Sequence, residues 1–272
     1  MKNMNFKGFR KFVTVVCLLA LMTTLTSSCK NGGTVVYQDN INYTKEDLVK
    51  KPFTEIEVDM VADVYYTQTD QDKQEVRLDF SKIKNPELRD KFQKATKTVY
   101  RDGKLIIGVG NKVSGNNNLK RGERVIVYVT STDLTKVTME GVGSFNAEAI
   151  NSDVFSVDNE GVGDIRIANL LANKVEVDNE GVGSIFLGNV KADSFSVTNE
   201  GVGNVKVTHF KGDKLKVDNE GVGSVTADVD CQAVDAELEG VGSIKLSGTT
   251  RRFNKEKDGV GSIKVSDLKV LK

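Results

Sequence analysis

The sequence predicts an all-β protein, a right-handed parallel β-helix (solenoid) of ~20-residue coils with one short N-terminal helix. The first observation is that Glu-Gly-Val-Gly returns at nearly fixed spacing, with aspartate replacing glutamate in the last copy. The first glycines of the seven copies are Gly141, Gly161, Gly181, Gly201, Gly221, Gly240 and Gly259. The second observation is that apolar residues within each unit alternate with polar ones, which is typical of strands with one buried face. No unit shows an apolar 3.6-residue period, so a helical repeat is excluded.

Aligning the units on the tetrapeptide produces columns of apolar residues. Two positions after the second glycine stand Phe145, Ile165, Ile185, Val205, Val225, Ile244 and Ile263. Three positions before the glutamate stand Val137, Val157, Val177, Val197, Val217 and Ala236, until Lys255 breaks the column. We therefore expect successive coils to stack their strands in parallel, about 4.8 Å apart, around an aliphatic core.

The two glycines of each tetrapeptide are expected to form a tight corner, where the chain takes positive φ or approaches a neighbouring backbone closely. The direction of the valine between them is open. Unbroken alternation from Val157 to Ile165 would leave Val162 outside, beside Glu160. A change of phase at the corner would bury it. We favour burial, because seven exposed valines would form a long apolar stripe.

Two polar columns flank the corner. Asparagines recur at Asn159, Asn179, Asn199 and Asn219, where stacked side-chain amides can hydrogen-bond from coil to coil. The acidic column comprises Glu140, Glu160, Glu180, Glu200, Glu220, Glu239 and Asp258. Like charges in register are destabilising, so solvent, nearby lysines or a bound cation must offset them. We interpret this row as a solvated acidic face and the candidate interaction strip, and predict neither a metal site nor a cofactor.

The region before the array, residues 53–133, is expected to form irregular coils and a cap, followed by seven regular coils over 134–272. Asn85 is a plausible N-cap, with Pro86 at the first position of a short helix that covers the open end of the solenoid. Asp102-Gly103 between two apolar runs predicts a hairpin turn. Val125–Val129 predicts the strand that leads into the array.

The N-terminus has the features of an export signal. Four basic residues precede an apolar run from Phe12 to Leu25, and Leu25-Thr26-Ser27-Ser28-Cys29 resembles a bacterial lipobox. We expect a signal peptide over 1–28, lipid attachment at Cys29, and a tether over 29–52 before a single domain over 53–272. The alternative is an ordinary cleavable signal with an incidental cysteine.

Composition narrows the function classes. Cleavage before Cys29 would leave 34 Lys+Arg against 38 Asp+Glu, a formal charge of −4 that argues against nucleic-acid binding. Cys17 lies in the signal segment and Cys29 is assigned to the lipid. Cys231 is then alone, and the fold has no intramolecular disulfide.

Several of these features together resemble one family. They are the lipoprotein start, an opening strand at Phe53-Thr54-Glu55-Ile56, Val125–Val129 followed by Leu134-Thr135-Lys136-Val137, and the serial Gly-x-Gly followed by Ser or Asp and then Ile or Val. The chain is similar over about 53–266 to the putative auto-transporter adhesin, head GIN domain family of Bacteroidetes and related bacteria. The resemblance implies a right-handed β-helix in a surface or periplasmic location. In that family the middle residue is often small and polar, whereas here it is valine throughout.

The sequence therefore predicts a non-catalytic cell-envelope lipoprotein of the outer membrane, an adhesin or binding module. Its expected partners are the membrane, through the lipid, and an extracellular glycan or matrix protein. Two alternatives stay open: a polysaccharide-processing β-helix enzyme, and a self-associating structural envelope protein. Against an enzyme, the coils leave almost no residues for projecting loops, and the chain has a single histidine, His209, and no tryptophan.

Overall fold

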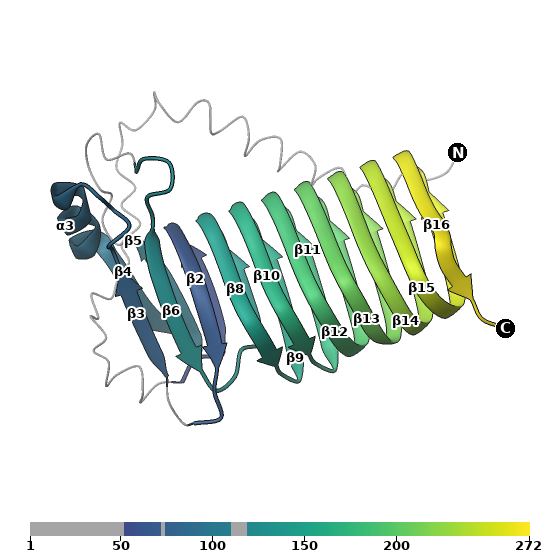
Figure 1. Ribbon diagram of the computed structural model, residues 1–272, viewed down its shortest axis with the longest axis horizontal. Coiled ribbons are helices and arrows are strands. Elements are labelled where there is room, and N and C mark those ends of the chain that lie inside the picture. Colours follow the sequence, from purple (N-terminus) through teal and green to yellow (C-terminus); the bar gives the residue numbers. More distant parts are fainter. Residues whose placement is uncertain (1–51, 72–73, 110–118) are drawn as a thin grey trace. The chain divides into compact units, whose positions relative to one another are not determined.

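The structure, a computed structural model, describes residues 52–71, 74–109 and 119–272 (Figure 1). The expected signal peptide, Cys29 and nearly all of the tether lie outside these residues. Before the array, the elements are β1 (Glu55–Asp59), β2 (Val61–Gln68), β3 (Glu75–Asp79), α3 (Pro86–Ala95), β4 (Thr96–Arg101), β5 (Lys104–Val109) and β6 (Val125–Ser131). The array comprises β7 (Lys136–Met139), β8 (Val142–Asn151), β9 (Val154–Asn159), β10 (Val162–Leu171), β11 (Lys174–Asn179), β12 (Val182–Asn199), β13 (Val202–Asn219), β14 (Val222–Leu238), β15 (Val241–Lys257) and β16 (Val260–Val270).

The array is a parallel β-helix of about seven turns, as the sequence predicts (Figure 1). Each coil crosses two β-faces. The first sheet stacks β2, β8, β10, the first halves of β12 to β15, and β16. The second stacks β1, β7, β9, β11 and the second halves of β12 to β15. Early coils use two strands each. From β12 to β15 one strand of 17 or 18 residues runs through both faces and turns the second corner without a break.

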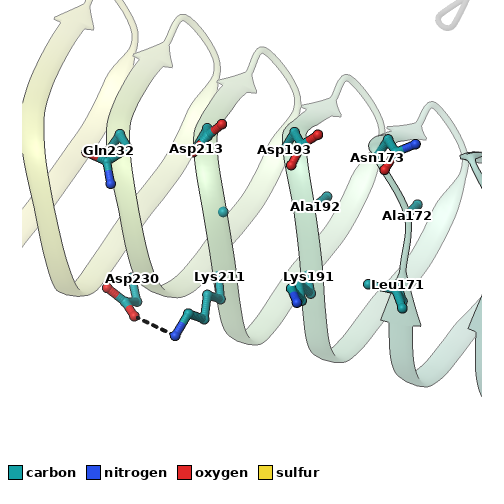
Figure 2. A pocket seen from close by; sticks show the side chains of 11 residues that line it. Leu171, Ala172, Asn173, Lys191, Ala192, Asp193, Lys211, Asp213, Asp230 and Gln232 are labelled. Atoms are coloured by element: carbon teal, nitrogen blue, oxygen red, sulfur yellow. Dashed lines mark ion pairs between the residues drawn. The ribbon is translucent and has the colours of Figure 1, made fainter.

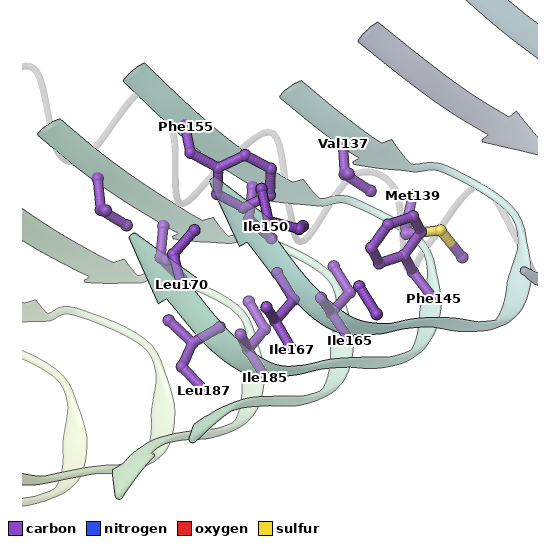
Figure 3. Packing of buried hydrophobic residues seen from close by; sticks show 14 of the residues in the cluster. Val137, Met139, Phe145, Ile150, Phe155, Ile165, Ile167, Leu170, Ile185 and Leu187 are labelled. Atoms are coloured by element: carbon purple, nitrogen blue, oxygen red, sulfur yellow. The ribbon is translucent and has the colours of Figure 1, made fainter. Parts of the chain in front are cut away.

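The predicted apolar columns form one continuous core between the two sheets. Phe145, Ile165 and Ile185 are fully buried in register, and Phe155 packs from the opposite sheet (Figure 3). Lys255, which breaks one column, is exposed and lies in the part of β15 that pairs with β14 alone. The Cys231 thiol is free and buried, and burial raises its pKa.

Glycine is required at the corners mainly because the backbones of successive coils lie very close together there. The N–H groups of Glu180 and Gly181 both donate to the carbonyl of Asn159, at 2.9 and 2.7 Å, and that of Val182 donates to the carbonyl of Gly161 at 2.9 Å. This pattern repeats along the array and brings the backbones so close that a Cβ on Gly203 would lie 1.7 Å from the carbonyl oxygen of Gly183. Positive φ is a second reason for glycine, but only in some copies of the tetrapeptide. Gly183, the second glycine of its copy, has a φ of +152°.

The expectation that the valines join the core is wrong. All seven point outward, with exposed fractions from 42 % at Val182 to 73 % at Val260. The alternation continues through the corner without a change of phase, so that Asn179 and Gly181 lie inside while Glu180 and Val182 lie outside. The inside positions must be glycine because the preceding coil's carbonyl occupies the space of a Cβ.

The asparagines form the expected ladder inside the corner. Nδ2 of Asn159 donates to Oδ1 of Asn179 at 2.7 Å, Asn179 donates likewise to Asn199 at 2.6 Å, and Asn199 to Asn219 at 2.7 Å. Asn219 ends the ladder by donating to the carbonyl of Gly223. At the other end, Oδ1 of Asn159 is buried without a hydrogen-bond donor among the described residues. The four asparagines are at most 1 % exposed, so the ladder belongs to the interior.

The elements before the array follow the sequence signals. Asn85 caps α3 by accepting from the N–H of Leu88 at 3.0 Å, and Pro86 is the first helical residue. Asp102 and Gly103 have φ of 51° and 83°, as the hairpin between β4 and β5 requires. In Figure 1, α3 lies at the end of the array where β3 and β4 pair antiparallel with their neighbours. These antiparallel strands end the parallel stacking on that side.

One coil escapes detection in the sequence. β1 and β2 lie directly against the first regular coil, with Val58 opposite Met139 and Val61 opposite Val142. Asp59-Met60-Val61-Ala62 is therefore an eighth corner, in which Met60 and Ala62 replace the glycines. On the side away from the array, β1 pairs with β5, which ends at Val109, and β2 pairs with β6, which begins at Val125.

Candidate binding surface

The corner that joins the second sheet to the first carries an exposed apolar stripe, which we call the valine edge. Its residues are Val142, Val162, Val182, Val202, Val222, Val241 and Val260, which pair in register from coil to coil. Val61 of the eighth corner continues the line and is half-buried. An uninterrupted apolar stripe that rigid backbone hydrogen bonds hold in place is typical of an interaction surface.

The acidic row predicted from sequence runs beside the valine edge, two residues earlier in each coil. Glu140, Glu160, Glu180, Glu239 and Asp258 are exposed, whereas Glu200 and Glu220 are half-buried. The hydrogen-bond pattern of the corner places each glutamate one coil from the next, about 4.8 Å apart along the stack. The structure therefore brings the predicted residues together on one surface, and Asp59 of the eighth corner extends the row.

Burial and neighbouring carboxylates raise the pKa of Glu140 in this row and of Glu237 beside it. Burial, and then the charges of Glu57, Glu160 and Asp59, raise the pKa of Glu140. Burial, and then Asp218 and Glu239, raise the pKa of Glu237, a half-buried residue two positions before Glu239. The ionised forms are therefore destabilised in the folded chain, and a cationic partner group would relieve this repulsion.

A metal ion is one way to offset such a row. In residues 52–71, 74–109 and 119–272, no group of three or more His, Cys, Asp or Glu side chains is arranged to hold one. A small hollow of about 70 Å³ is lined by Asp158, Asn159, Glu160, Asp178 and Glu180. Its acidic walls favour positively charged groups.

The opposite corner is hollowed by an open groove of about 460 Å³ (Figure 2). Lys191 and Lys211 line one side of the groove, and Asp193 and Asp213 line the other. Lys211 forms an ion pair with Asp230 at 3.6 Å. This groove meets a wider hollow of about 930 Å³, whose lining includes His209. His209 lies in β13, half-buried, with Nδ1 2.9 Å from Oδ2 of Asp228. The walls carry both signs of charge, so no ligand class is favoured here.

The architecture and its uninterrupted outer columns define a β-solenoid, a class of protein whose stacked repeats present extended surfaces. The chain belongs to the family described as "Putative auto-transporter adhesin, head GIN domain", whose model matches residues 52–225 and 196–272. Membership of an adhesin family indicates a protein of the cell surface or envelope.

Solved structures agree with this assignment. The chain is similar to a putative adhesin from Bacteroides fragilis NCTC 9343, with a TM-score of 0.70 and 27% identity, over 79% of this chain and 92% of that one. It also shares its fold with a putative adhesin from Parabacteroides distasonis ATCC 8503, with a TM-score of 0.51 and 14% identity, over 78% of this chain and 92% of that one. No curated protein matches the sequence.

In the described part of the chain, no helix combines the length and the apolar character needed to cross a membrane.

Proposed function

We propose that the protein is a non-catalytic adhesin of the outer membrane that holds an extracellular ligand against the valine edge. The observation that carries this proposal is the unbroken line of seven exposed valines, each beside a carboxylate of the acidic row. Membership of an adhesin family supports it.

The chemistry of the edge favours a protein ligand. Valine side chains stabilise a complex by removing apolar area from water, about 25 cal/mol per Å². The acidic row adds attraction for lysine and arginine and steers encounter. A matrix protein can supply apolar side chains to the valine edge and basic side chains to the acidic row. A neutral glycan has fewer groups that would bind the valines or the carboxylates. The repetition also allows one long ligand to contact several coils at once, which raises avidity.

The proposed anchor is a lipid on Cys29, which would place the solenoid at the end of the tether. We expect the Cys29→Ala chain to leave the membrane fraction and to keep its fold, since the described domain begins well after this residue. Fractionation followed by circular dichroism checks both points. A Cys29→Ala chain that stays with the membrane would show that the lipid assignment is wrong.

Binding is tested by screening the purified chain against immobilised matrix proteins and glycans. The expected result is saturable binding to at least one matrix protein, weakened by salt because the acidic row contributes. A broad screen in which neither a matrix protein nor a glycan binds would remove the basis of the proposal.

A further inference from the structure

We propose that the outer face of the first sheet is a second binding surface, which takes an acidic polysaccharide along the solenoid axis. The inference goes beyond the valine edge and relies on the proposed function only for its extracellular setting. A single register line across ten strands carries it. We call this line the basic–aromatic row; its members, in order, are Arg77, Tyr128, Tyr65, Asn146, Arg166, Phe186, Lys206, Thr226, Lys245 and Lys264.

The row points outward along its whole length. In the eight strands between β3 and β16 its neighbours are buried, such as Ile165 and Ile167 beside Arg166, and in β3 and β16 they are half-buried, so the row lies on the opposite face. All five cations of the row are exposed, and Tyr65 and Tyr128 are among the exposed large hydrophobic residues. Nine steps of about 4.8 Å give a track of roughly 43 Å.

The row holds cations and aromatic rings in contact with one another and contains no acidic residue. The guanidinium of Arg77 lies 4.0 Å from the ring centre of Tyr128, which stacks on Tyr65 at 5.7 Å. Further along, Nζ of Lys206 lies 5.9 Å from the ring centre of Phe186. Such contacts hold the cations above apolar surface, where a charged and partly apolar ligand meets both.

The surroundings of the row are most basic over the later coils. The flanking column two residues earlier carries mainly hydroxyl and amide groups; its members from β12 onward are Ser184, Asn204, Ser224, Ser243 and Ser262. Acidic groups lie near the first half of the row, where Asp164 pairs with Arg166 at 2.8 Å and Asp63 pairs with Arg124 at 2.8 Å. On the other flank, Asp228 is held by His209 and Ser247, and Asp267 lies opposite Ser247 in β16. Lys206, Lys245 and Lys264 therefore face solvent beside hydroxyl donors, which suits carboxylate or sulfate groups.

The spacing of the cations along the row favours a polysaccharide ligand over a nucleic acid. Five cations over roughly 43 Å give about one per 9 Å, whereas duplex DNA carries one negative charge per ~1.7 Å. Binding of single strands depends on bases that stack on aromatic faces, and here Arg77 and Tyr65 already cover Tyr128. A linear glycan with a carboxylate or sulfate only on some of its sugars matches the sparse spacing of the cations.

The test measures binding of the full chain, purified in detergent, to four immobilised polymers: heparin, polygalacturonate, neutral dextran and single-stranded poly(dT). Heparin and polygalacturonate separate sulfate from carboxylate recognition. The row variant combines Lys206→Gln, Lys245→Gln and Lys264→Gln. The matched control combines Lys174→Gln, Lys214→Gln and Lys255→Gln, which removes the same charge from the second sheet.

We expect the wild-type chain to bind heparin or polygalacturonate above dextran, with an affinity that falls as salt rises. The row variant should lose about tenfold in affinity, and the control should stay within about twofold. Equal binding to dextran, an unchanged row variant, or an equal loss in the control would overturn the proposal, and tighter binding to poly(dT) would replace it with a nucleic-acid surface.

Failure of this surface is distinguishable from failure of the valine edge. Replacing valines of the edge with serine should leave polysaccharide binding unchanged, because the edge lies on the corner and the row on the sheet. Loss of polysaccharide binding in such an edge variant would contradict a separate second surface.

Discussion

Gly203→Ala is expected to lower the free energy of unfolding by about 3 kcal/mol or more, because the new Cβ has no space. The new Cβ would lie 1.7 Å from the carbonyl oxygen of Gly183, a backbone atom of the preceding coil. Relief of this overlap requires two coils to separate, and each coil depends on its neighbours for burial. Urea unfolding followed by circular dichroism measures the change.

Gly122→Ala is the control for this prediction. Gly122 has a positive φ of 86°, but nothing lies within 4 Å of its Cβ position. Its replacement should cost only the strain of a left-handed backbone, about 1–2 kcal/mol. If Gly203→Ala proved no more destabilising than Gly122→Ala, close approach between coils would not be the reason for the glycines.

Asn179→Leu is expected to cost about 2–4 kcal/mol, because it leaves two buried polar groups unpaired. Nδ2 of Asn159 would lose its acceptor and Oδ1 of Asn199 its donor. Leucine itself fits the column, since Leu238 occupies the equivalent position in a later coil and is fully buried. The loss of unfolding free energy therefore measures the missing hydrogen bonds rather than a misfit of the leucine side chain. Thermal and urea unfolding both measure this loss.

Asn159→Leu provides the comparison. Oδ1 of Asn159 already lacks a donor among the described residues, so this change removes one unpaired acceptor and creates another on Asn179. The expected change is within about 1 kcal/mol. Equal losses for Asn159→Leu and Asn179→Leu would show that the ladder hydrogen bonds do not stabilise the corner.

Most of the architecture was accessible from the sequence because a repeat displays each structural column many times. The period, the apolar columns, the cap of α3 at Asn85 and the hairpin turn at Asp102 all depend on local patterns, and the structure confirms them. The eighth corner was not accessible. Met60 and Ala62 occupy the glycine positions there, and only the pairing of Val61 with Val142 reveals it.

The valine prediction failed because it gave the cost of an exposed apolar stripe more weight than strand alternation. Alternation from Val177 to Ile185 already places Val182 outside. The requirement for glycine explains why: a residue inside this corner meets the preceding backbone, so Gly181 and Gly183 must occupy the inside positions. An exposed stripe is unfavourable for an isolated fold and acceptable for a surface that binds a partner.

The acidic row could be located from sequence, because it follows from the repeat alone. The basic–aromatic row was only half visible. Arg166, Phe186 and Lys206 share one position in the aligned coils, but Arg77, Tyr128 and Tyr65 join them through the strand order β3-β6-β2-β8, which does not follow the chain. Contacts between distant strands cannot be read from periodicity.

The central claim is that the valine edge binds the extracellular ligand, and one comparison of variants tests it most directly. The edge variant combines Val182→Ser, Val202→Ser and Val222→Ser, and the control combines Val154→Ser, Leu171→Ser and Val270→Ser, which are equally exposed elsewhere. The edge variant and the control variant should both unfold with nearly the free energy of the wild-type chain. Against the matrix protein found by screening, the edge variant should lose at least about tenfold in affinity while the control binds as the wild type does. Unchanged binding by the edge variant would contradict the claim.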